Sequence, residues 1–198
     1  MIVAGLTGSI ALGKSETAKM FAARGIPVFD SDAAVHALYE PGGAAVEPLQ
    51  GLVPDAIIDG SVDRRRLATL VQADPSLLAK VEAVVHPLVK AGQAAFLADA
   101  EGQSDIALLD IPLLFETGRE KDVDVIIVVS ARADLQRARA MARPGMTAEK
   151  FDFILSRQVA DAEKRARADY VIDTSTGLDD TAREVDQVIA AIRAGGKI

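Results

Sequence analysis

The sequence opens with Met1-Ile2-Val3-Ala4-Gly5-Leu6-Thr7-Gly8-Ser9-Ile10-Ala11-Leu12-Gly13-Lys14-Ser15, and this stretch decides the fold. The apolar run over residues 2–6 predicts a buried strand. The spacing from Gly8 to Gly13-Lys14-Ser15 is that of a phosphate-binding loop joining a strand to a helix. Glycines let the backbone curl until its N–H groups face phosphate oxygens, and the helix adds its positive end. The predicted nucleotide-binding residues are Gly8, Ser9, Ile10, Ala11, Leu12, Gly13, Lys14, Ser15 and Glu16.

Two side chains of this loop have predicted roles. Lys14 can reach the terminal phosphates of a nucleotide, and the Ser15 hydroxyl can bind the Mg²⁺ ion that bridges them. We therefore expect ATP and Mg²⁺ as cofactors.

Composition restricts the class of protein. The 198 residues suffice for one sizeable core, and 22 Lys and Arg against 29 Asp and Glu give a formal charge of −7. This charge argues against nucleic acid or an anionic membrane as partner. The absence of cysteine suits a reducing cytoplasm, and neither a signal peptide nor a membrane span is indicated. We expect a soluble cytoplasmic protein that acts on a small molecule.

Short runs of apolar and β-branched residues alternate with helical patterns along the chain. This alternation predicts an α/β fold with a five-stranded parallel sheet sandwiched by helices. The predicted strands are residues 2–6, 26–29, 106–109, 125–129 and 170–172.

The helical patterns include two long excursions from the sheet. The first and last helices are expected at residues 14–24 and 178–194. The excursion between the second and third strands is far longer than a crossover requires, and its helical pieces are residues 64–72, 76–85 and 87–100. A second excursion, residues 132–168, reads as helical and charged, broken only at Pro144-Gly145.

Acidic residues stand at the ends of two predicted strands, where an open parallel sheet binds its ligand. After the second strand, Asp32 is our candidate for the general base that takes a proton from an attacking hydroxyl. For Asp30, a role near the phosphates and a role as cap of the helix starting near Ala33 both remain open. After the third strand, Asp110 is placed to hold Mg²⁺ through its water shell, with a capping or turn role as the alternative.

The start of the second excursion is rich in arginine. Arg139 and Arg143 share a helical face at the i, i+4 spacing, and Asp134 is the only carboxylate among residues 132–143. A mobile helix carrying these arginines could close over ATP, neutralise charge on the transferring phosphate and exclude water. The only histidines, His36 and His86, do not by themselves support a metal site.

Together these motifs resemble the dephospho-coenzyme A kinase family, and the resemblance covers nearly the whole chain. Its most specific pieces are Val85-His86-Pro87-Leu88 and Asp110-Ile111-Pro112-Leu113-Leu114-Phe115-Glu116. The others are the phosphate loop, Asp30-Ser31-Asp32, Arg143-Pro144-Gly145-Met146-Thr147, Arg157-Gln158 and Ala168-Asp169-Tyr170-Val171-Ile172-Asp173.

The resemblance implies a P-loop kinase that transfers the γ-phosphate of ATP to the 3′-hydroxyl of dephospho-CoA, the last step of CoA biosynthesis. It implies a kinase core of residues 1–32, 101–131 and 169–198, a helical CoA-binding insertion at 33–100 and a lid at 132–168. Asp32 matches the base, Lys14 and Arg139 complete the catalytic set, and Arg143 is a second lid arginine. The implied acceptor contacts are Asp32, His86, Pro112, Leu113, Leu114 and Glu116.

Two loop positions depart from the family pattern, which usually has glycine at Ala11 and serine or threonine at Glu16. A positive φ at Ala11 would cost about 1 kcal/mol or more. Glu16 gains about 0.3–1 kcal/mol at a helix start, whereas repulsion by a bound phosphate is about 4 kcal/mol at an effective dielectric of 20. Repulsion dominates if the side chain faces the nucleotide and is screened if it faces solvent. We expect weaker ATP binding than in a Glu16→Thr variant.

Three other functions use the same loop. A GTP-driven switch is disfavoured because the sequence contains no asparagine and so lacks the Asn-Lys-x-Asp guanine motif. Another nucleoside or nucleotide kinase remains an alternative, as does a nucleotide-binding protein whose catalysis is impaired by Ala11 and Glu16.

Overall fold

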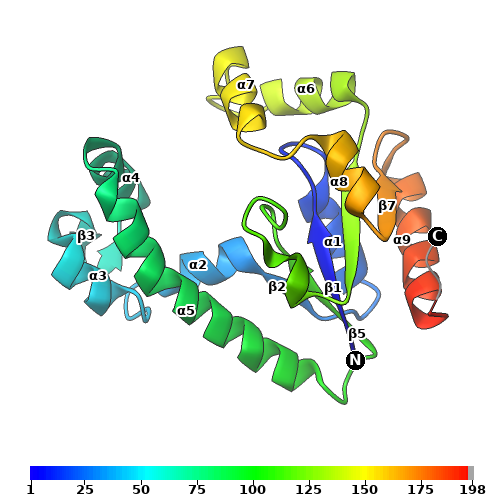
Figure 1. Cartoon of the computed structure of the whole chain (residues 1–198), viewed down its shortest axis with the longest axis horizontal. Helices are drawn as coiled ribbons and strands as arrows, with labels where there is room; N and C mark the ends of the chain where they lie inside the picture. Colours follow the sequence, from blue (N-terminus) through cyan, green and yellow to red (C-terminus); the bar gives the residue numbers. More distant parts are fainter. Residues whose placement is uncertain (196–198) are drawn as a thin grey trace. The chain divides into compact units, whose positions relative to one another are not determined.

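The computed structural model describes residues 1–195, which form two compact units. One unit combines Met1–Phe29 with the chain from Ala100 onward, and the other is Asp30–Asp99. Figure 1 shows the sheet and its helices in the first unit, and helices around a small hairpin in the second.

The first unit contains the five-stranded parallel sheet that the sequence predicts. Its strands are β1 (Ile2–Thr7), β2 (Val28–Asp30), β5 (Ile106–Asp110), β6 (Val125–Ser130) and β7 (Tyr170–Asp173), in the order β2-β5-β1-β6-β7. Strand β2 begins at Val28 and not at residue 26 as predicted. Pro27 has no N–H to donate, and its carbonyl accepts a hydrogen bond of 2.8 Å from the Leu108 N–H.

Helices α1 (Lys14–Ala22) and α9 (Leu178–Arg193) cover one face of this sheet (Figure 1). Phe21 of α1 and Val185 of α9 are fully buried against Leu6, Leu108 and other strand residues. The first helix ends two residues earlier than predicted, because Gly25 adopts a φ of 78° and turns the chain. On the other face a Cβ added at Gly5 would lie only 2.9 Å from Leu114, so the loop after β5 packs directly on β1.

The segment 132–168 contains three helices, α6 (Ala133–Met141), α7 (Ala148–Ser156) and α8 (Asp161–Arg167). The prediction of a single break at Pro144-Gly145 is therefore wrong, since the chain also leaves the helix at residues 157–160. At this second break the Val159 N–H donates to the Glu116 carboxylate and not to a helix carbonyl. The break is therefore stabilised by Glu116, which is too far away in the sequence for a local pattern to predict it.

The second unit contains α2 (Ser31–Tyr39), α3 (Val46–Leu52), a 3₁₀ turn at Pro54–Ala56, the hairpin β3 (Ile57–Ile58) with β4 (Ser61–Val62), α4 (Arg64–Ala73) and α5 (Ser76–Ala100). The two helices predicted at 76–85 and 87–100 are one helix that continues through Pro87. A proline inside a helix costs about 3 kcal/mol. Val81, Val85 and Val89 are buried at successive i, i+4 positions, so packing on both sides of Pro87 maintains the helix.

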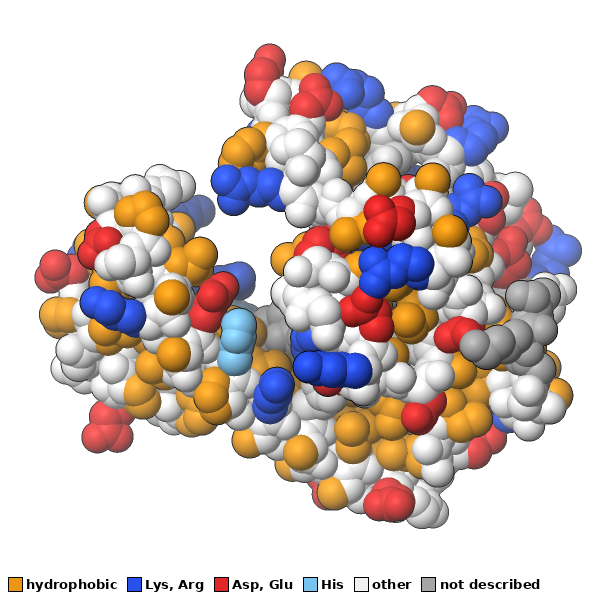
Figure 2. All heavy atoms as spheres, in the orientation of Figure 1, with side chains coloured by type: hydrophobic (Ala, Val, Ile, Leu, Met, Phe, Trp, Pro, Cys, Tyr) orange, Lys and Arg blue, Asp and Glu red, His pale blue; other side chains and the backbone are white. Residues whose placement is uncertain are grey.

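Surface charges of both signs are interspersed over the face shown in Figure 2. Within residues 1–195, no helix has both the length and the apolar character needed to cross a membrane.

The end of β1 gives a first test. A Cβ at Gly8 would lie 2.7 Å from the Val129 carbonyl oxygen, and backbone atoms cannot move aside cheaply. We expect Gly8→Ala to lower the free energy of unfolding by about 1–3 kcal/mol, measured by urea denaturation. The control is Gly51→Ala in α3, where an added Cβ would meet no atom within 4 Å beyond the adjoining helix backbone. That change should stabilise the protein by about 0.5–1 kcal/mol. A Gly8→Ala protein as stable as the parent would contradict the close approach.

Candidate functional site

The loop between β1 and α1 has the left-handed turns that a phosphate-binding loop requires. Ala11 has a φ of 63° and Gly13 a φ of 93°, and Gly13 caps α1 by accepting the Thr17 N–H at 3.1 Å. The positive φ that raised concern at Ala11 is therefore present. Its methyl group is buried in a cluster with Ala140 and Phe151, which offsets part of the strain.

Lys14 and Asp110, both predicted site residues, form an ion pair in this structure. Lys14 is the first residue of α1, and Asp110 is the last residue of β5. Strand β5 pairs with β1, and Leu6 of β1 lies opposite Asp110. The Asp110 side chain is 3% exposed, so its carboxylate needs a charged partner. Ser15, at the next position along α1, is exposed to solvent.

Thr174 connects the loop to the segment 132–168. The buried Thr174 hydroxyl donates to the Leu12 carbonyl at 2.8 Å and accepts from Arg139 at 2.9 Å, while the Thr174 carbonyl accepts a second Arg139 hydrogen bond at 2.7 Å. Sequence reasoning missed this residue. Because Thr174 follows β7 directly, the strand-end rule that selected Asp110 could have found it.

The four arginines near α6 differ in their surroundings. Arg132 pairs with Asp134 at 3.0 Å, and this hydrogen bond lowers the pKa of the Asp134 carboxyl. Arg137 pairs with Asp152 at 3.1 Å and lies over the Phe151 ring. Arg139 and Arg143 instead line a pocket beside the loop. The prediction that they share a helical face is wrong, because α6 ends at Met141 and Arg143 lies two residues beyond it.

This pocket combines apolar and basic groups. Its walls include Ala11, Gly13, Met20, Leu178 and the two arginines. Apolar side chains suit a flat base, and arginines suit phosphates, so the pocket matches the chemistry of a nucleotide. Glu16 also lines it, but its side chain is 57% exposed and pairs with Lys19 at 2.7 Å.

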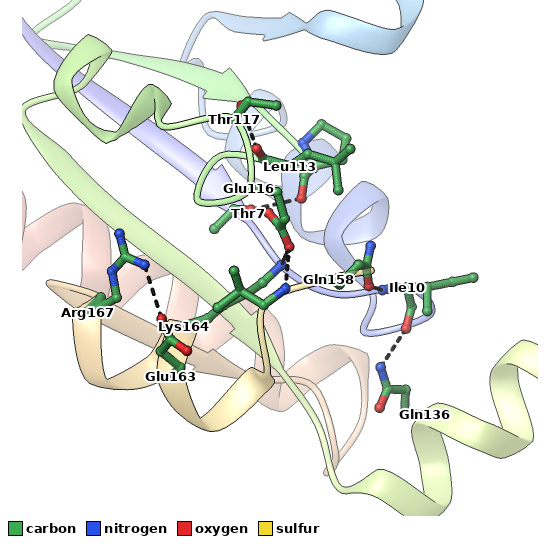
Figure 3. A network of polar contacts seen from close by, with 12 residues as sticks. Thr7, Ile10, Leu113, Glu116, Thr117, Gln136, Gln158, Glu163, Lys164 and Arg167 are labelled. Carbon is green, nitrogen blue, oxygen red and sulfur yellow. Dashed lines mark hydrogen bonds and ion pairs between the residues drawn. The ribbon is translucent and has the colours of Figure 1, made fainter. Parts of the chain in front are cut away.

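The stretch after β5 is divided between surface and core. Leu113 is exposed, Pro112 is half-buried and accepts the Thr7 hydroxyl at 3.1 Å, and Leu114 is fully buried. Glu116 accepts the Val159 N–H at 2.9 Å and pairs at 2.8 Å with Lys164, whose side chain is completely buried (Figure 3). The stretch therefore joins α8 and the 157–160 break to the sheet. No local pattern predicts that Lys164 is buried, because its position depends on the distant Glu116.

In the second unit, the capping alternative for Asp30 is confirmed. Its carboxylate accepts the N–H groups of Asp32 and Ala33, each at 2.9 Å, at the start of α2. Asp32 is exposed in the first turn of α2 and His86 is exposed on α5. Their roles toward an acceptor stay predictions. Across the described residues, no group of three or more His, Cys, Asp or Glu side chains forms a metal site.

The fold and the loop define the class first: this is a P-loop kinase. The crystal structure of TT1252 from Thermus thermophilus superposes with a TM-score of 0.84 at 35% identity, covering 96% of this chain and 97% of that one. Dephospho-CoA kinase from Campylobacter jejuni has the same fold, with a TM-score of 0.73, 23% identity and 98% of both chains covered.

The particular family follows from sequence. The dephospho-CoA kinase family model matches residues 1–180. A dephospho-CoA kinase of Mesorhizobium japonicum is 53% identical over 98% of both chains. The chain belongs to the dephospho-CoA kinase family, as the resemblance of its motifs indicates.

The buried ion pair gives a second test. Lys164→Met leaves the Glu116 carboxylate buried without its counter-charge, so we expect a loss of about 3–5 kcal/mol in the free energy of unfolding. Adding Glu116→Gln removes the unpaired charge and keeps an acceptor for Val159, so the double variant should regain most of the loss. Urea denaturation at neutral pH measures both. A single variant within 1 kcal/mol of the parent would contradict a buried charged pair.

Proposed function

We propose that the chain transfers the γ-phosphate of ATP to the 3′-hydroxyl of the dephospho-CoA ribose, giving CoA and ADP. The observation that carries this proposal is the identity of about half of all residues with dephospho-CoA kinases that match over nearly their full length. The phosphate-binding loop and the Lys14–Asp110 pair supply matching chemistry. The cysteine-free sequence suits a reducing cytoplasm, where we place the enzyme.

On the donor side, backbone N–H groups of residues 8–16, other than that of Ile10, which donates to Gln158, bind the phosphates, and Lys14 contacts the terminal ones. Arg139 and Arg143 line the adjoining pocket and neutralise charge as the phosphate transfers. We assign the adenine ring of ATP to the same pocket, whose apolar walls include Met20 and Leu178.

The residues present fit Mg²⁺. Ser15 offers a hydroxyl and Asp110 a buried carboxylate, and Mg²⁺ prefers oxygen ligands with several waters retained. We propose that these two side chains hold it, Asp110 through water. When bound, the ion neutralises phosphate charge.

On the acceptor side we propose Asp32 as the general base, because its carboxylate can accept the proton of the attacking hydroxyl. The helical unit Asp30–Asp99 is the proposed CoA-binding insertion, with His86 and the stretch Pro112, Leu113, Leu114 and Glu116 as acceptor contacts. Exposure favours His86 and Leu113 for direct contact over the buried Leu114. Residues 132–168 are the proposed lid.

The direct experiment is to incubate the protein with ATP, Mg²⁺ and dephospho-CoA and to detect CoA and ADP by chromatography. Nucleosides and nucleoside monophosphates serve as competing acceptors. ATP turnover with those and none with dephospho-CoA would favour another kinase. Tight ATP binding without transfer to any acceptor would favour a protein with impaired catalysis.

The assignment of Asp32 as general base gives a third test. Asp32→Asn cannot take a proton, so we expect kcat to fall by roughly 10²–10⁴ with ATP affinity nearly unchanged. The matched control is Asp30→Asn, because asparagine caps helices as well as aspartate does and activity should persist. Full activity of Asp32→Asn in a coupled ADP assay would remove Asp32 from this role.

The Glu16–Lys19 pair gives a fourth test. The pair turns the Glu16 side chain toward solvent and a counter-charge, which is the condition under which its repulsion of phosphate is screened. We therefore expect Glu16→Thr to tighten ATP binding by no more than about threefold by titration calorimetry. Lys19→Ala should weaken ATP binding more in the parent than in the Glu16→Thr background. A tenfold gain from Glu16→Thr alone would show that Glu16 faces the nucleotide.

A further inference from the structure

Ile10, in the middle of the phosphate-binding loop, is contacted on both sides of its backbone by glutamine side chains from outside the loop. The Ile10 N–H donates to the Gln158 amide oxygen at 3.0 Å, and the Gln136 amide nitrogen donates to the Ile10 carbonyl at 2.9 Å (Figure 3). The two glutamines therefore satisfy both polar groups of this residue, one as acceptor and one as donor.

Both glutamines come from the proposed lid. Gln136 lies on α6 and is only 8% exposed, and Gln158 lies in the break between α7 and α8. The break is itself fixed, because the neighbouring Val159 N–H donates to Glu116, which pairs with the buried Lys164. Gln158 thus projects from an anchored backbone.

Apolar contacts run alongside these hydrogen bonds. Ala11 is buried with Ala140 of α6 and Phe151 of α7, and Ile10 packs on the same cluster. The loop and the segment 132–168 consequently share two hydrogen bonds at Ile10 and an apolar cluster at the adjacent Ala11, so a movement of either changes the other.

We propose that Gln136 and Gln158 are positioning residues that hold the phosphate-binding loop in its phosphate-ready shape and couple that shape to the position of the lid. Neither needs to touch the substrate. The glutamines order the loop before the nucleotide arrives, so binding does not have to supply that ordering.

Ligand-free protein gives the first readout, which does not depend on the proposed function. Hydrogen exchange at the Ile10 amide, followed by NMR, reports the Gln158 contact directly. Gln158→Leu removes the acceptor at similar volume, and exchange should quicken about three- to tenfold. Gln158→Glu keeps a carboxylate oxygen as acceptor, so exchange should stay near the parent rate.

Leucine and glutamate substitutions at Gln136 should change the exchange of the Ile10 amide in a different pattern from those at Gln158. Here the glutamine donates, and an ionised glutamate has no donor, so Gln136→Glu should be as damaging as Gln136→Leu. The opposite responses of the two sites to Gln→Glu distinguish specific hydrogen bonding from loss of packing. The exposed Gln187 on α9 supplies the control, because Gln187→Leu should leave every readout unchanged.

Binding of inorganic tripolyphosphate, measured by calorimetry, gives the second readout. We expect Gln158→Leu and Gln136→Leu to weaken it about three- to tenfold. In the kinase assay the KM for ATP should rise by a similar factor with kcat at saturation nearly retained, since the lost energy is one of binding.

The outcomes separate this inference from the proposed function, on which only the kinetic readout rests. A parent that binds tripolyphosphate but makes no CoA would overturn the proposed function, and the exchange and binding readouts would still decide the role of the glutamines. Unchanged Ile10 exchange in Gln158→Leu, or equal responses of Gln158→Glu and Gln158→Leu, would overturn the inference.

Discussion

A loop that offers main-chain N–H groups to a ligand has few of them left to hold its own shape, and this constraint governs the site. The loop between β1 and α1 gets its contacts from elsewhere: the Thr174 hydroxyl at Leu12, two glutamines at Ile10 and the Val129 backbone against Gly8. These groups come from β6, the end of β7 and the segment 132–168. The conformation of the loop therefore depends on contacts from several parts of the first unit.

Charge burial at the strand ends follows from the same arrangement. One ion pair forms at the last residue of β5, Lys14 with Asp110, and a second forms in the stretch that follows, Lys164 with Glu116. Lys14 is 15% exposed, so its ammonium group is accessible to a ligand, as the proposed phosphate contact requires. Lys164 is completely buried and offers no such access. The Lys14–Asp110 pair is therefore placed to contact a ligand, whereas the Lys164–Glu116 pair anchors the backbone of the stretch after β5.

The sequence predicted what depends on local patterns and failed where distant contacts decide. Apolar runs located the five strands of the parallel sheet but not the short hairpin β3–β4, and glycine spacing located the loop, because burial and backbone freedom leave local signals. The continuity of α5 through Pro87 and the break at 157–160 depend on packing and on Glu116, which lie outside any local window. Lys14 could be predicted from the glycine spacing of the loop and Asp110 from a strand end, and the strand-end rule extends to Thr174. Gln136 and Gln158 act through distant contacts that spacing does not reveal.

Ala11 shows why a departure from a family pattern need not impair the site. Its left-handed backbone costs about 1–2 kcal/mol relative to glycine. Its methyl group is buried against Ala140 and Phe151 and returns about 0.8 kcal/mol, which offsets part of that cost. Ala11 thus gives no physical reason to expect a loop that has lost its shape. With Glu16 paired to Lys19, both departures are compensated by neighbours, which favours an active kinase over a binding protein with impaired catalysis.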